Sequence, residues 1–355
     1  MTSALPTPCT IEDVTPDWLT QALDAPVVGV ASEPIGAGVG LVATLHRLAI
    51  SYESGNGGPA TLIAKLPSVA PSSRFVAQLL SMYRREVGFY SELAQRTALG
   101  HPQCRYADFD EHTQNFVLLL EDLASGRTID QLEGCGRGDA ELAVRRLGEH
   151  HAGWWADPAL DSTEWLPRIS DAPLPAAVAY SFEQSWGATL ELFADRIPGD
   201  VVGLGERFPS LIPAILDHLA ALPATLSHGD YRLDNMFFVD GDVALCDWQL
   251  VDRSRGARDL GYFATQSLLP EDRAAWENEL VDLYVETLAE GGVTGYDRET
   301  AWADYRMSAL LGLAYPVVAT GSLDHSDPRA YKLTGDMLDR AIRAIVELDC
   351  ISLAD

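Results

Sequence analysis

An Asp-Gly pair at residues 240–241, set between two short apolar runs, most strongly constrains how this chain can fold. The runs cover residues 236–239 and 243–246, and Asp-Gly between two such runs is typical of a two-residue type I′ hairpin. Counting outward from the turn brings Asp247 next to Asn235 at the open end. Neighbouring positions on paired strands lie about 5 Å apart. The sequence therefore predicts a hairpin that brings a carboxamide and a carboxylate together.

The residues just before this hairpin are polar and suit one kind of chemistry. Residues 228–235 read HGDYRLDN. Moving the γ-phosphoryl group of a nucleoside triphosphate needs positioned charge more than covalent help. Asp230 is suited to orient an acceptor hydroxyl and accept its proton, and Arg232 to neutralise charge on the moving group. Asn235 and Asp247 are hard oxygen ligands suited to Mg²⁺. The alternative is a hairpin with unrelated polar residues at its mouth.

The spacing resembles the protein-kinase signature H-R-D-x-x-x-x-N followed by D-F-G. Gly229 replaces the arginine, and Trp248-Gln249 replaces Phe-Gly. This variant is similar to the aminoglycoside phosphotransferase and choline kinase-like superfamily. The loop resembles the acyl-CoA-dehydrogenase-associated branch, and Leu-Glu-Asp-Leu at 120–123 also resembles the ecdysteroid kinase-like branch. The resemblance implies an α+β, bilobal protein kinase-like fold, with a small β-rich N-lobe and a larger, mainly helical C-lobe.

Lysine occurs only twice among the 25 basic residues of the chain, so each lysine calls for a specific reason. Lys65 closes an apolar run over 61–65 that reads as a strand and is similar to the Val-Ala-Ile-Lys strand of kinases. Its compact ammonium suits the α- and β-phosphates of a nucleotide. We expect its acidic partner to be Glu86, on a helix predicted over 72–98, with Glu92 as the alternative. Otherwise Lys65 is a surface lysine and Glu86 only solvates its helix.

Three glycines precede this lysine strand, at Gly36, Gly38 and Gly40. Glycines let a backbone approach phosphates closely, and the position resembles the nucleotide-binding loop of the kinase-like fold. A strand over 42–51 is expected to follow, which disfavours a dinucleotide-binding fingerprint because that motif continues into a helix. A plain hairpin turn is the alternative.

A further apolar run at 115–120 reads as a buried strand and ends in Glu121-Asp122-Leu123. The resemblance implies that this is the hinge leaving the small lobe, where backbone groups near Glu121 and Leu123 bind adenine. The alternative is that the acidic side chains of Glu121 and Asp122 only cap the turn that follows.

These motifs divide the chain into an N-lobe over residues 1–122, which binds the nucleotide, and a C-lobe over residues 123–355, which carries the catalytic loop, the metal site and a helical acceptor region. Within the C-lobe a helix is expected over 139–155, and His150 and His151 on it are expected to be packed or hydrogen-bonded in the core. Further helical patterns lie near 270–291, 298–316 and 328–350.

The segment 256–262 reads GARDLGY, and a similar segment occurs in the superfamily. The resemblance implies that Asp259 hydrogen-bonds the catalytic loop and that His228 braces the loop backbone. Four C-terminal residues are candidates for lining an acceptor pocket, although core packing explains them equally well: Trp302, Tyr305, Arg306 and Tyr315.

Composition excludes several classes of protein. The net charge of −27 repels nucleic acid and anionic membranes, so neither is an expected partner. No apolar run approaches the roughly 18 residues that a membrane span needs, and the N-terminus lacks the features of a signal peptide. Five scattered cysteines without a Cys-x-x-Cys pair favour reduced thiols and a cytoplasmic location.

The expected activity is transfer of a phosphoryl group from ATP, with GTP as the alternative nucleotide, to a hydroxyl group of a small molecule, with Mg²⁺ as cofactor. No Ala-Pro-Glu segment follows the catalytic loop, so no platform for a protein substrate is evident. Acceptor classes that remain open are an aminoglycoside or other antibiotic, a hydroxyacyl-CoA and a steroid-like alcohol. The competing hypothesis is a nucleotide-binding regulatory pseudokinase without turnover.

Overall fold

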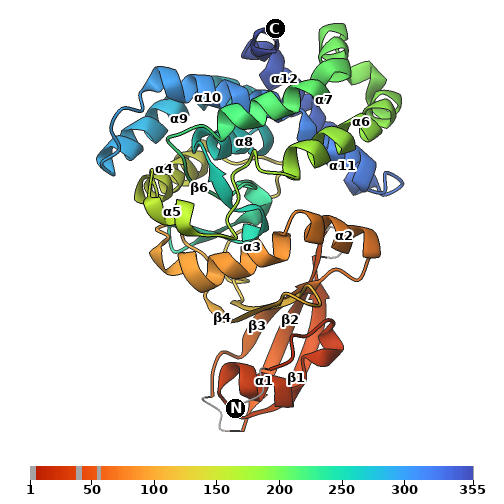
Figure 1. The fold of residues 1–355 in the computed structure, drawn as a ribbon, viewed down its shortest axis with the longest axis vertical. Helices are drawn as coiled ribbons and strands as arrows, with labels where there is room; N and C mark the ends of the chain where they lie inside the picture. Colours follow the sequence, from red (N-terminus) through yellow and green to blue (C-terminus); the bar gives the residue numbers. More distant parts are fainter. Residues whose placement is uncertain (1–4, 37–41, 54–56, 355) are drawn as a thin grey trace. The chain divides into compact units, whose positions relative to one another are not determined.

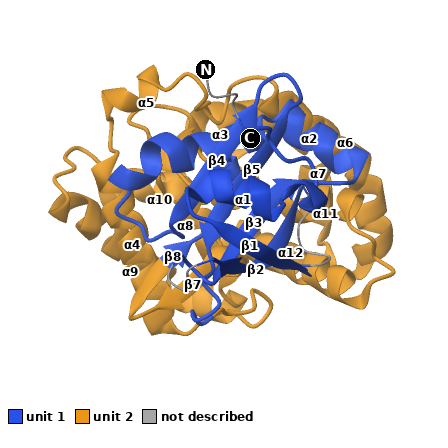
Figure 2. Cartoon of the chain, turned by 90° about the horizontal axis from the view of Figure 1, so that it is seen from below, with its two compact units in different colours: residues 1–127, 244–250 blue, residues 128–243, 251–355 orange. Residues whose placement is uncertain are grey.

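The computed structural model describes residues 5–36, 42–53 and 57–354 (Figure 1). The chain divides into two compact units. Unit 1 contains residues 1–127 and 244–250, and unit 2 contains residues 128–243 and 251–355 (Figure 2). The N-lobe expected from the sequence ends at Asp122, and unit 1 continues to Arg127 and then takes up the second segment.

Within the described part of unit 1, five antiparallel strands form one sheet in the order β1-β2-β3-β5-β4. The apolar strands β3 and β5 lie inside the sheet, as their continuous apolar sequences favour, and Leu62, Leu66 and Leu119 are buried there. Trp18 and Leu19 of the helix α1 (Pro16–Leu23) complete this core. The strands are β1 (Val27–Ile35), β2 (Ala43–Tyr52), β3 (Thr61–Pro67), β4 (Cys104–Asp110) and β5 (Asn115–Glu121).

The single helix expected over 72–98 is wrong, because the chain forms α2 (Pro71–Leu79) and α3 (Met82–Gly88) instead. Ser81 between them adopts a left-handed backbone with φ 53°, and an α-helix of L-residues cannot continue through such a residue. A π-helical turn over Phe89–Leu93 and a 3₁₀ turn over Ala94–Arg96 follow α3. The break sets the direction of α3, which carries Glu86.

The segment 244–250 is fixed within unit 1 by backbone and aromatic contacts. The Leu245 N–H donates to the Gly100 carbonyl at 2.7 Å, and the indole of Trp248 donates to the Leu245 carbonyl at 3.0 Å. The Trp248 ring stacks on Phe89 with centroids 3.7 Å apart and 6° between the ring planes. Asp247 is therefore held against the helical segment that carries Glu86.

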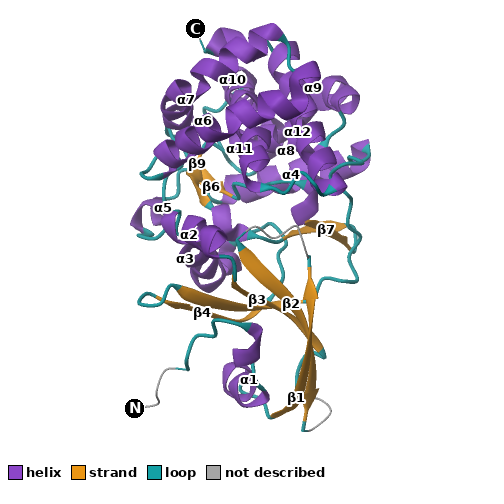
Figure 3. Cartoon of the chain, turned by 90° about the vertical axis from the view of Figure 1, so that its right-hand side faces the viewer, coloured by secondary structure: helices purple, strands orange, loops and turns teal. Residues whose placement is uncertain are grey.

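Unit 2 is mainly helical (Figure 3). Its helix α8 is buried along its whole length, and the short strands β6 (Thr225–Ser227) and β9 (Asp252–Ser254) pair antiparallel. No helix in the described ranges of the chain is both long and apolar enough to cross a membrane. The helices are α4 (Arg137–Gly153), α5 (Pro158–Ser162), α6 (Leu174–Phe193), α7 (Gly199–Leu219), α8 (Ala257–Ser267), α9 (Pro270–Glu290), α10 (Arg298–Leu311), α11 (Ala314–Ser322) and α12 (Pro328–Glu347).

The predicted hairpin is confirmed as β7 (Met236–Val239) and β8 (Asp242–Leu245). Asp240 and Gly241 have φ values of 51° and 83°, and positive φ at both central residues is the signature of a type I′ turn. The fold as a whole is α+β, as the sequence predicts, with the strands of the sheet in unit 1 and most helices in unit 2.

Candidate active site

Lys65 lies in the middle of the sheet of unit 1 and contacts two carboxylates. It pairs with Leu45 of β2 and Leu118 of β5 in the strand register. Its Nζ lies 2.8 Å from Glu86 Oε1 and 2.8 Å from Asp247 Oδ1. The structure thus brings Lys65 together with Glu86, the partner that the sequence favours over Glu92, and with the proposed metal ligand Asp247.

Burial and charge oppose each other in this cluster. Burial disfavours the charged ammonium of Lys65, but the charges of Asp247 and Glu86 outweigh burial and raise the pKa of Lys65. Burial also raises the pKa of Glu86 to about 7, against the opposing charge of Lys65. Lys65 therefore stays cationic at neutral pH and forms an ion pair with Asp247.

Asp247 is held in an unusual backbone conformation, with φ 65°. Such a conformation is rare for a residue other than glycine and persists where the surroundings determine it. Both carboxylate oxygens are engaged within unit 1, because Oδ1 contacts Lys65 and Oδ2 accepts a hydrogen bond from the Gln249 amide at 3.2 Å. The side chain is therefore oriented rather than free to rotate.

The glycine-rich segment is described only in part. Gly36 follows β1 with φ 66°, a left-handed backbone that favours glycine. Gly38 and Gly40 lie outside the described residues, so the phosphate-loop interpretation of the three glycines stays a prediction.

The segment expected to be a hinge leaves β5 with its side chains engaged. The Glu121 carboxylate accepts a hydrogen bond from the Gln103 N–H at 3.0 Å, and the Leu123 carbonyl accepts one from the Gly126 N–H at 2.9 Å. Asp122 accepts from the Ala124 N–H at 3.2 Å, as expected of a turn cap, and also pairs with Arg47. The adenine-binding role of this segment stays a prediction.

In unit 2, Asp230 is buried and surrounded by donors. Its Oδ1 accepts a hydrogen bond from the Tyr262 hydroxyl at 2.8 Å and lies 3.2 Å from Arg232 Nε, and its Oδ2 accepts one from Asn235 Nδ2 at 2.9 Å. Burial favours the neutral acid, but the charges of Arg232 and His228, with the hydrogen bonds from Tyr262 and Asn235, lower the pKa of Asp230. Asp230 is therefore a buried, ionised carboxylate, able to accept a hydrogen bond from a further hydroxyl.

Asn235 orients the candidate base within unit 2. Its Nδ2 donates both to the Asp230 carbonyl and to the Asp230 carboxylate, at 2.9 Å each. An amide nitrogen does not bind a cation, so Oδ1 is the ligand atom that Asn235 can offer. Asn235 belongs to unit 2 and Asp247 to unit 1, and each is oriented by contacts within its own unit.

The two proposed metal ligands, the Asp247 carboxylate and the Asn235 carboxamide oxygen, are suited to Mg²⁺ rather than to a metal held by protein ligands alone. The described residues contain no group of three or more histidine, cysteine, aspartate or glutamate side chains able to hold a metal ion. Mg²⁺ is usually bound by one or two carboxylates together with substrate phosphates and water. One carboxylate and one carboxamide oxygen match that pattern.

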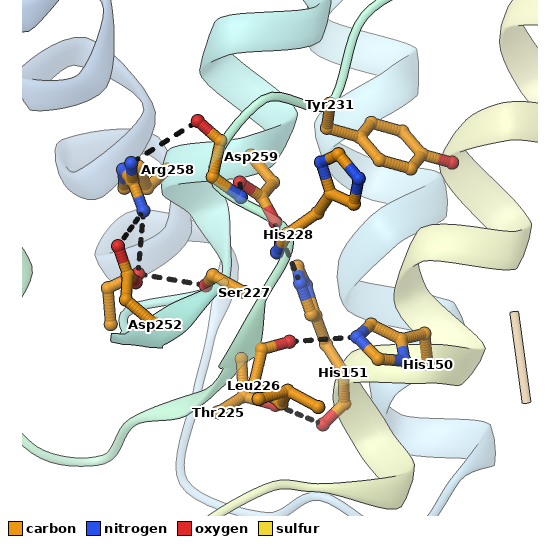
Figure 4. Close-up of polar contacts among 12 residues, drawn as sticks. His150, His151, Thr225, Leu226, Ser227, His228, Tyr231, Asp252, Arg258 and Asp259 are labelled. Atoms are coloured by element: carbon orange, nitrogen blue, oxygen red, sulfur yellow. Dashed lines mark hydrogen bonds and ion pairs between the residues drawn. The ribbon is translucent and has the colours of Figure 1, made fainter. Parts of the chain in front are cut away.

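Asp259 on α8 anchors the backbone of the catalytic loop (Figure 4). Its carboxylate accepts hydrogen bonds from the His228 N–H at 2.7 Å and the Gly229 N–H at 3.0 Å. Burial opposes its ionisation, but His151 and Arg258 beside it lower the pKa of Asp259 to about 2. His228 Nδ1 in turn accepts from the Asp230 N–H at 3.1 Å. Both residues thus brace the loop, as the resemblance implied.

The two adjacent histidines of α4 are buried and hydrogen-bonded, as expected (Figure 4). His150 Nε2 donates to the Leu226 carbonyl at 2.8 Å. His151 Nε2 lies 3.4 Å from Asp259, and its Nδ1 lies 2.8 Å from the Tyr284 hydroxyl. Since a carboxylate only accepts, Nε2 carries the His151 proton and Nδ1 accepts from Tyr284.

Sequence reasoning missed Tyr262, although a signal for it was present. Tyr262 lies three residues after Asp259 on the same helix, and residues three apart share a face. Of the aromatic candidates near the C-terminus, Tyr315 packs on Tyr262 with ring centroids 4.4 Å apart. Trp302 instead stacks on Tyr305, whose hydroxyl donates to the buried Glu277. Tyr305 is therefore a core residue, and Trp302 is half-buried beside it.

Several solved structures share the fold of this chain. An aminoglycoside 2′-phosphotransferase-IIIa in complex with GDP has a TM-score of 0.54 at 13% identity, over 91% of this chain and 95% of that one. A choline/ethanolamine kinase family protein from Mesorhizobium loti has a TM-score of 0.53 at 14% identity, over 92% and 93%. An amicoumacin kinase in complex with AMP-PNP, Ca²⁺ and Ami has a TM-score of 0.53 at 12% identity, over 87% and 88%. These likenesses show a bilobal kinase-like fold.

A comparison of the sequence with models of protein families identifies the family of this chain. Residues 38–292 match the ecdysteroid kinase-like family, and the chain belongs to that family. A search of curated proteins finds no match to this sequence.

Proposed function

We propose that this chain is a small-molecule O-phosphotransferase that uses ATP, or GTP as the alternative nucleotide, with Mg²⁺. Membership of a kinase-like family supports phosphotransferase activity on a small molecule. The observation that carries the proposal is the contact of Lys65 with both Glu86 and Asp247, at 2.7 Å and 2.8 Å. A buried cation fixed by one helix carboxylate beside a metal-binding aspartate is the arrangement that positions nucleotide phosphates in kinases.

Asn235 and Asp247 would hold the Mg²⁺ ion. One support is the chemistry of their side-chain oxygen atoms. The other is the Asp240-Gly241 turn, which joins strand β7, directly after Asn235, to strand β8, shortly before Asp247. When bound, Mg²⁺ supplies positive charge that neutralises the β- and γ-phosphates.

Asp230 would act as the base. The acceptor hydroxyl donates its hydrogen bond to the Asp230 carboxylate, and the acceptor oxygen forms a bond to the γ-phosphorus. The bond between that phosphorus and the bridging oxygen breaks, and its electron pair leaves with the nucleoside diphosphate. The acceptor proton passes to Asp230, and Arg232, 3.2 Å from the same carboxylate, offers positive charge nearby.

The acceptor is a small molecule with a free hydroxyl group. Steroid-like alcohols are the first class to test because the family is described as ecdysteroid kinase-like. Aminoglycosides and choline-like alcohols follow, because proteins with this fold are named for acting on them. Hydroxyacyl-CoA compounds complete the set, from the sequence of the catalytic loop.

A mass-shift screen tests the proposal. The protein is incubated with ATP, Mg²⁺ and pooled compounds from these classes, and the products are read by mass spectrometry. The expected result is a gain of one phosphate on an alcohol, absent with Asp230→Asn. Binding of Mg·ATP without transfer to any compound would favour the regulatory alternative, and no binding of nucleotide would contradict both.

A further inference from the structure

Tyr262 on α8 contacts the candidate base directly. Its hydroxyl donates to Asp230 Oδ1 at 2.8 Å, and its side chain is buried. It stands on the same face of α8 as Asp259, which holds the backbone of the catalytic loop. One helix therefore fixes both the backbone of the loop and the side chain of its central aspartate.

The ring of Tyr262 has little freedom to move. It packs on Tyr315 with ring centroids 4.4 Å apart and 56° between the planes, and every residue of α8 is buried. Side chains in such interiors keep one rotamer because neighbouring atoms fill the space around them. The Tyr262 hydroxyl is thus a donor at a defined position, not one that adapts to Asp230.

The two oxygens of the Asp230 carboxylate differ in how many side chains contact them. An ionised carboxylate has about four lone-pair positions, two on each oxygen. Tyr262 and Arg232 lie at Oδ1, at 2.8 Å and 3.2 Å, and Asn235 donates to Oδ2 at 2.9 Å. The Arg232 contact is an ion pair rather than a hydrogen bond, so each oxygen keeps one acceptor position among the described side chains. The position on Oδ1 lies beside the Arg232 guanidinium at 3.2 Å, which leaves Oδ2 as the more open of the two oxygens.

We propose that Tyr262 is a positioning residue that fixes the rotation of the Asp230 carboxylate, so that Oδ2 receives the acceptor proton. The proposal rests on the proposed function and deepens it. The acceptor hydroxyl donates to Oδ2, on the oxygen that Asn235 also contacts, and so beside a proposed Mg²⁺ ligand. As the acceptor oxygen bonds to the γ-phosphorus, its proton moves to Oδ2, and the nucleoside diphosphate leaves with the electron pair of the broken bond.

Without the Tyr262 hydroxyl, Oδ1 gains an open acceptor position. An acceptor hydroxyl then binds either oxygen, and only one of the two arrangements aligns it with the phosphorus. Misplacement of a reacting group by about 1 Å can cost about a hundredfold in rate. Because Asn235 still donates to Oδ2 and Arg232 still lies beside Oδ1, the carboxylate keeps part of its orientation, and we expect a smaller loss than that, of about tenfold in kcat.

Tyr262→Phe is the test variant because it removes one oxygen atom and keeps the ring that packs on Tyr315. Water serves as the acceptor, so release of phosphate from ATP with Mg²⁺ is measured without any organic acceptor, and the Kd for ATP is measured in parallel. We expect kcat to fall about tenfold while KM and Kd for ATP stay within about twofold. A role confined to packing would lower the melting temperature and leave the kcat of the folded protein unchanged.

The matched control is Tyr296→Phe. Tyr296 is also buried, and its hydroxyl donates to a buried aspartate, Asp304, at 2.9 Å. This variant removes the same kind of hydrogen bond away from the catalytic loop, so it should lower stability and leave kcat unchanged.

The outcomes separate this inference from the proposed function. If Tyr262→Phe keeps the wild-type kcat while Asp230→Asn loses it, the positioning role is overturned and the phosphotransferase stands. If Tyr262→Phe changes only the KM for ATP, the inference is overturned as well. If the wild-type protein transfers phosphate neither to water nor to any pooled alcohol, the proposed function fails and the inference with it.

Discussion

Replacing Lys65 with methionine removes the buried cation between Glu86 and Asp247 and keeps most of the apolar stem of the side chain. Breaking a buried ion pair by removing one partner costs about 3–5 kcal/mol of unfolding free energy. Burial already raises the pKa of Glu86 to about 7 with Lys65 present. Without that cation, Glu86 takes up a proton at neutral pH, and the loss should lie near the lower figure, about 3 kcal/mol.

The same change should weaken nucleotide binding by a calculable amount. A hydrogen bond to a charged group contributes about 1.5–3 kcal/mol. If Lys65 contacts the phosphates of ATP, its loss raises the Kd for Mg·ATP by about tenfold to a hundredfold, since each 1.4 kcal/mol is tenfold. Titration calorimetry with Mg·ATP measures this change, and urea denaturation measures the loss of stability.

The other lysine provides the matched control. Lys332 is exposed and pairs with Asp336 four residues along α12, an interaction worth only a few tenths of a kcal/mol. Lys332→Met should therefore leave both the Kd for Mg·ATP and the unfolding free energy near their wild-type values. The reasoning about the Lys65 cluster is refuted if Lys65→Met binds Mg·ATP as tightly as Lys332→Met does.

Three further changes test separate parts of the structure. Burial lowers the pKa of His150 to about 3, from an ordinary 6.5, so the unfolded chain binds the extra proton and stability falls as pH drops below 6.5. Between pH 6.5 and 5.0, urea denaturation should show the wild type losing about 1.5 kcal/mol more than His150→Gln, and the exposed His112→Gln should follow the wild type. Asp259→Asn removes one acceptor from the loop amides, so the unfolding free energy measured by urea denaturation should fall by about 2 kcal/mol and most of kcat should be lost. A variant with wild-type stability and full activity would contradict the role of Asp259 in holding the loop. Ser81→Gly relieves a left-handed serine and should raise the unfolding free energy by about 0.5–1 kcal/mol, while a lower melting temperature would speak against that strain.

Local sequence signals predicted the features that depend on neighbouring residues. The turn at 240–241 could be predicted because Asp-Gly readily adopts positive φ at both positions. Lys65 and Glu86 could be paired because lysine is scarce in the chain and a helix was expected after the lysine strand.

Other features depend on contacts that a local pattern does not carry. The break at Ser81 has no glycine or proline to signal it, and it reflects how α3 packs in unit 1 rather than local propensity. Likewise, the return of 244–250 to unit 1 follows from long-range contacts such as that between Leu245 and Gly100. The hydrogen bond from the Tyr262 hydroxyl to Asp230 depends on where α8 lies in unit 2, which the sequence alone does not give.

The most direct test of the central claim is transfer of radiolabelled γ-phosphate from ATP, with Mg²⁺, to the alcohol found in the screen or to water. The wild-type protein is compared with Asp230→Asn, which keeps the size of the candidate base and removes its negative charge. Asp240→Asn is the control, because Asp240 is exposed in the type I′ turn and asparagine is equally favoured there. The account predicts a fall in transfer of at least about a hundredfold for Asp230→Asn and none for Asp240→Asn. Equal transfer by all three proteins would contradict the assignment of Asp230 as the base.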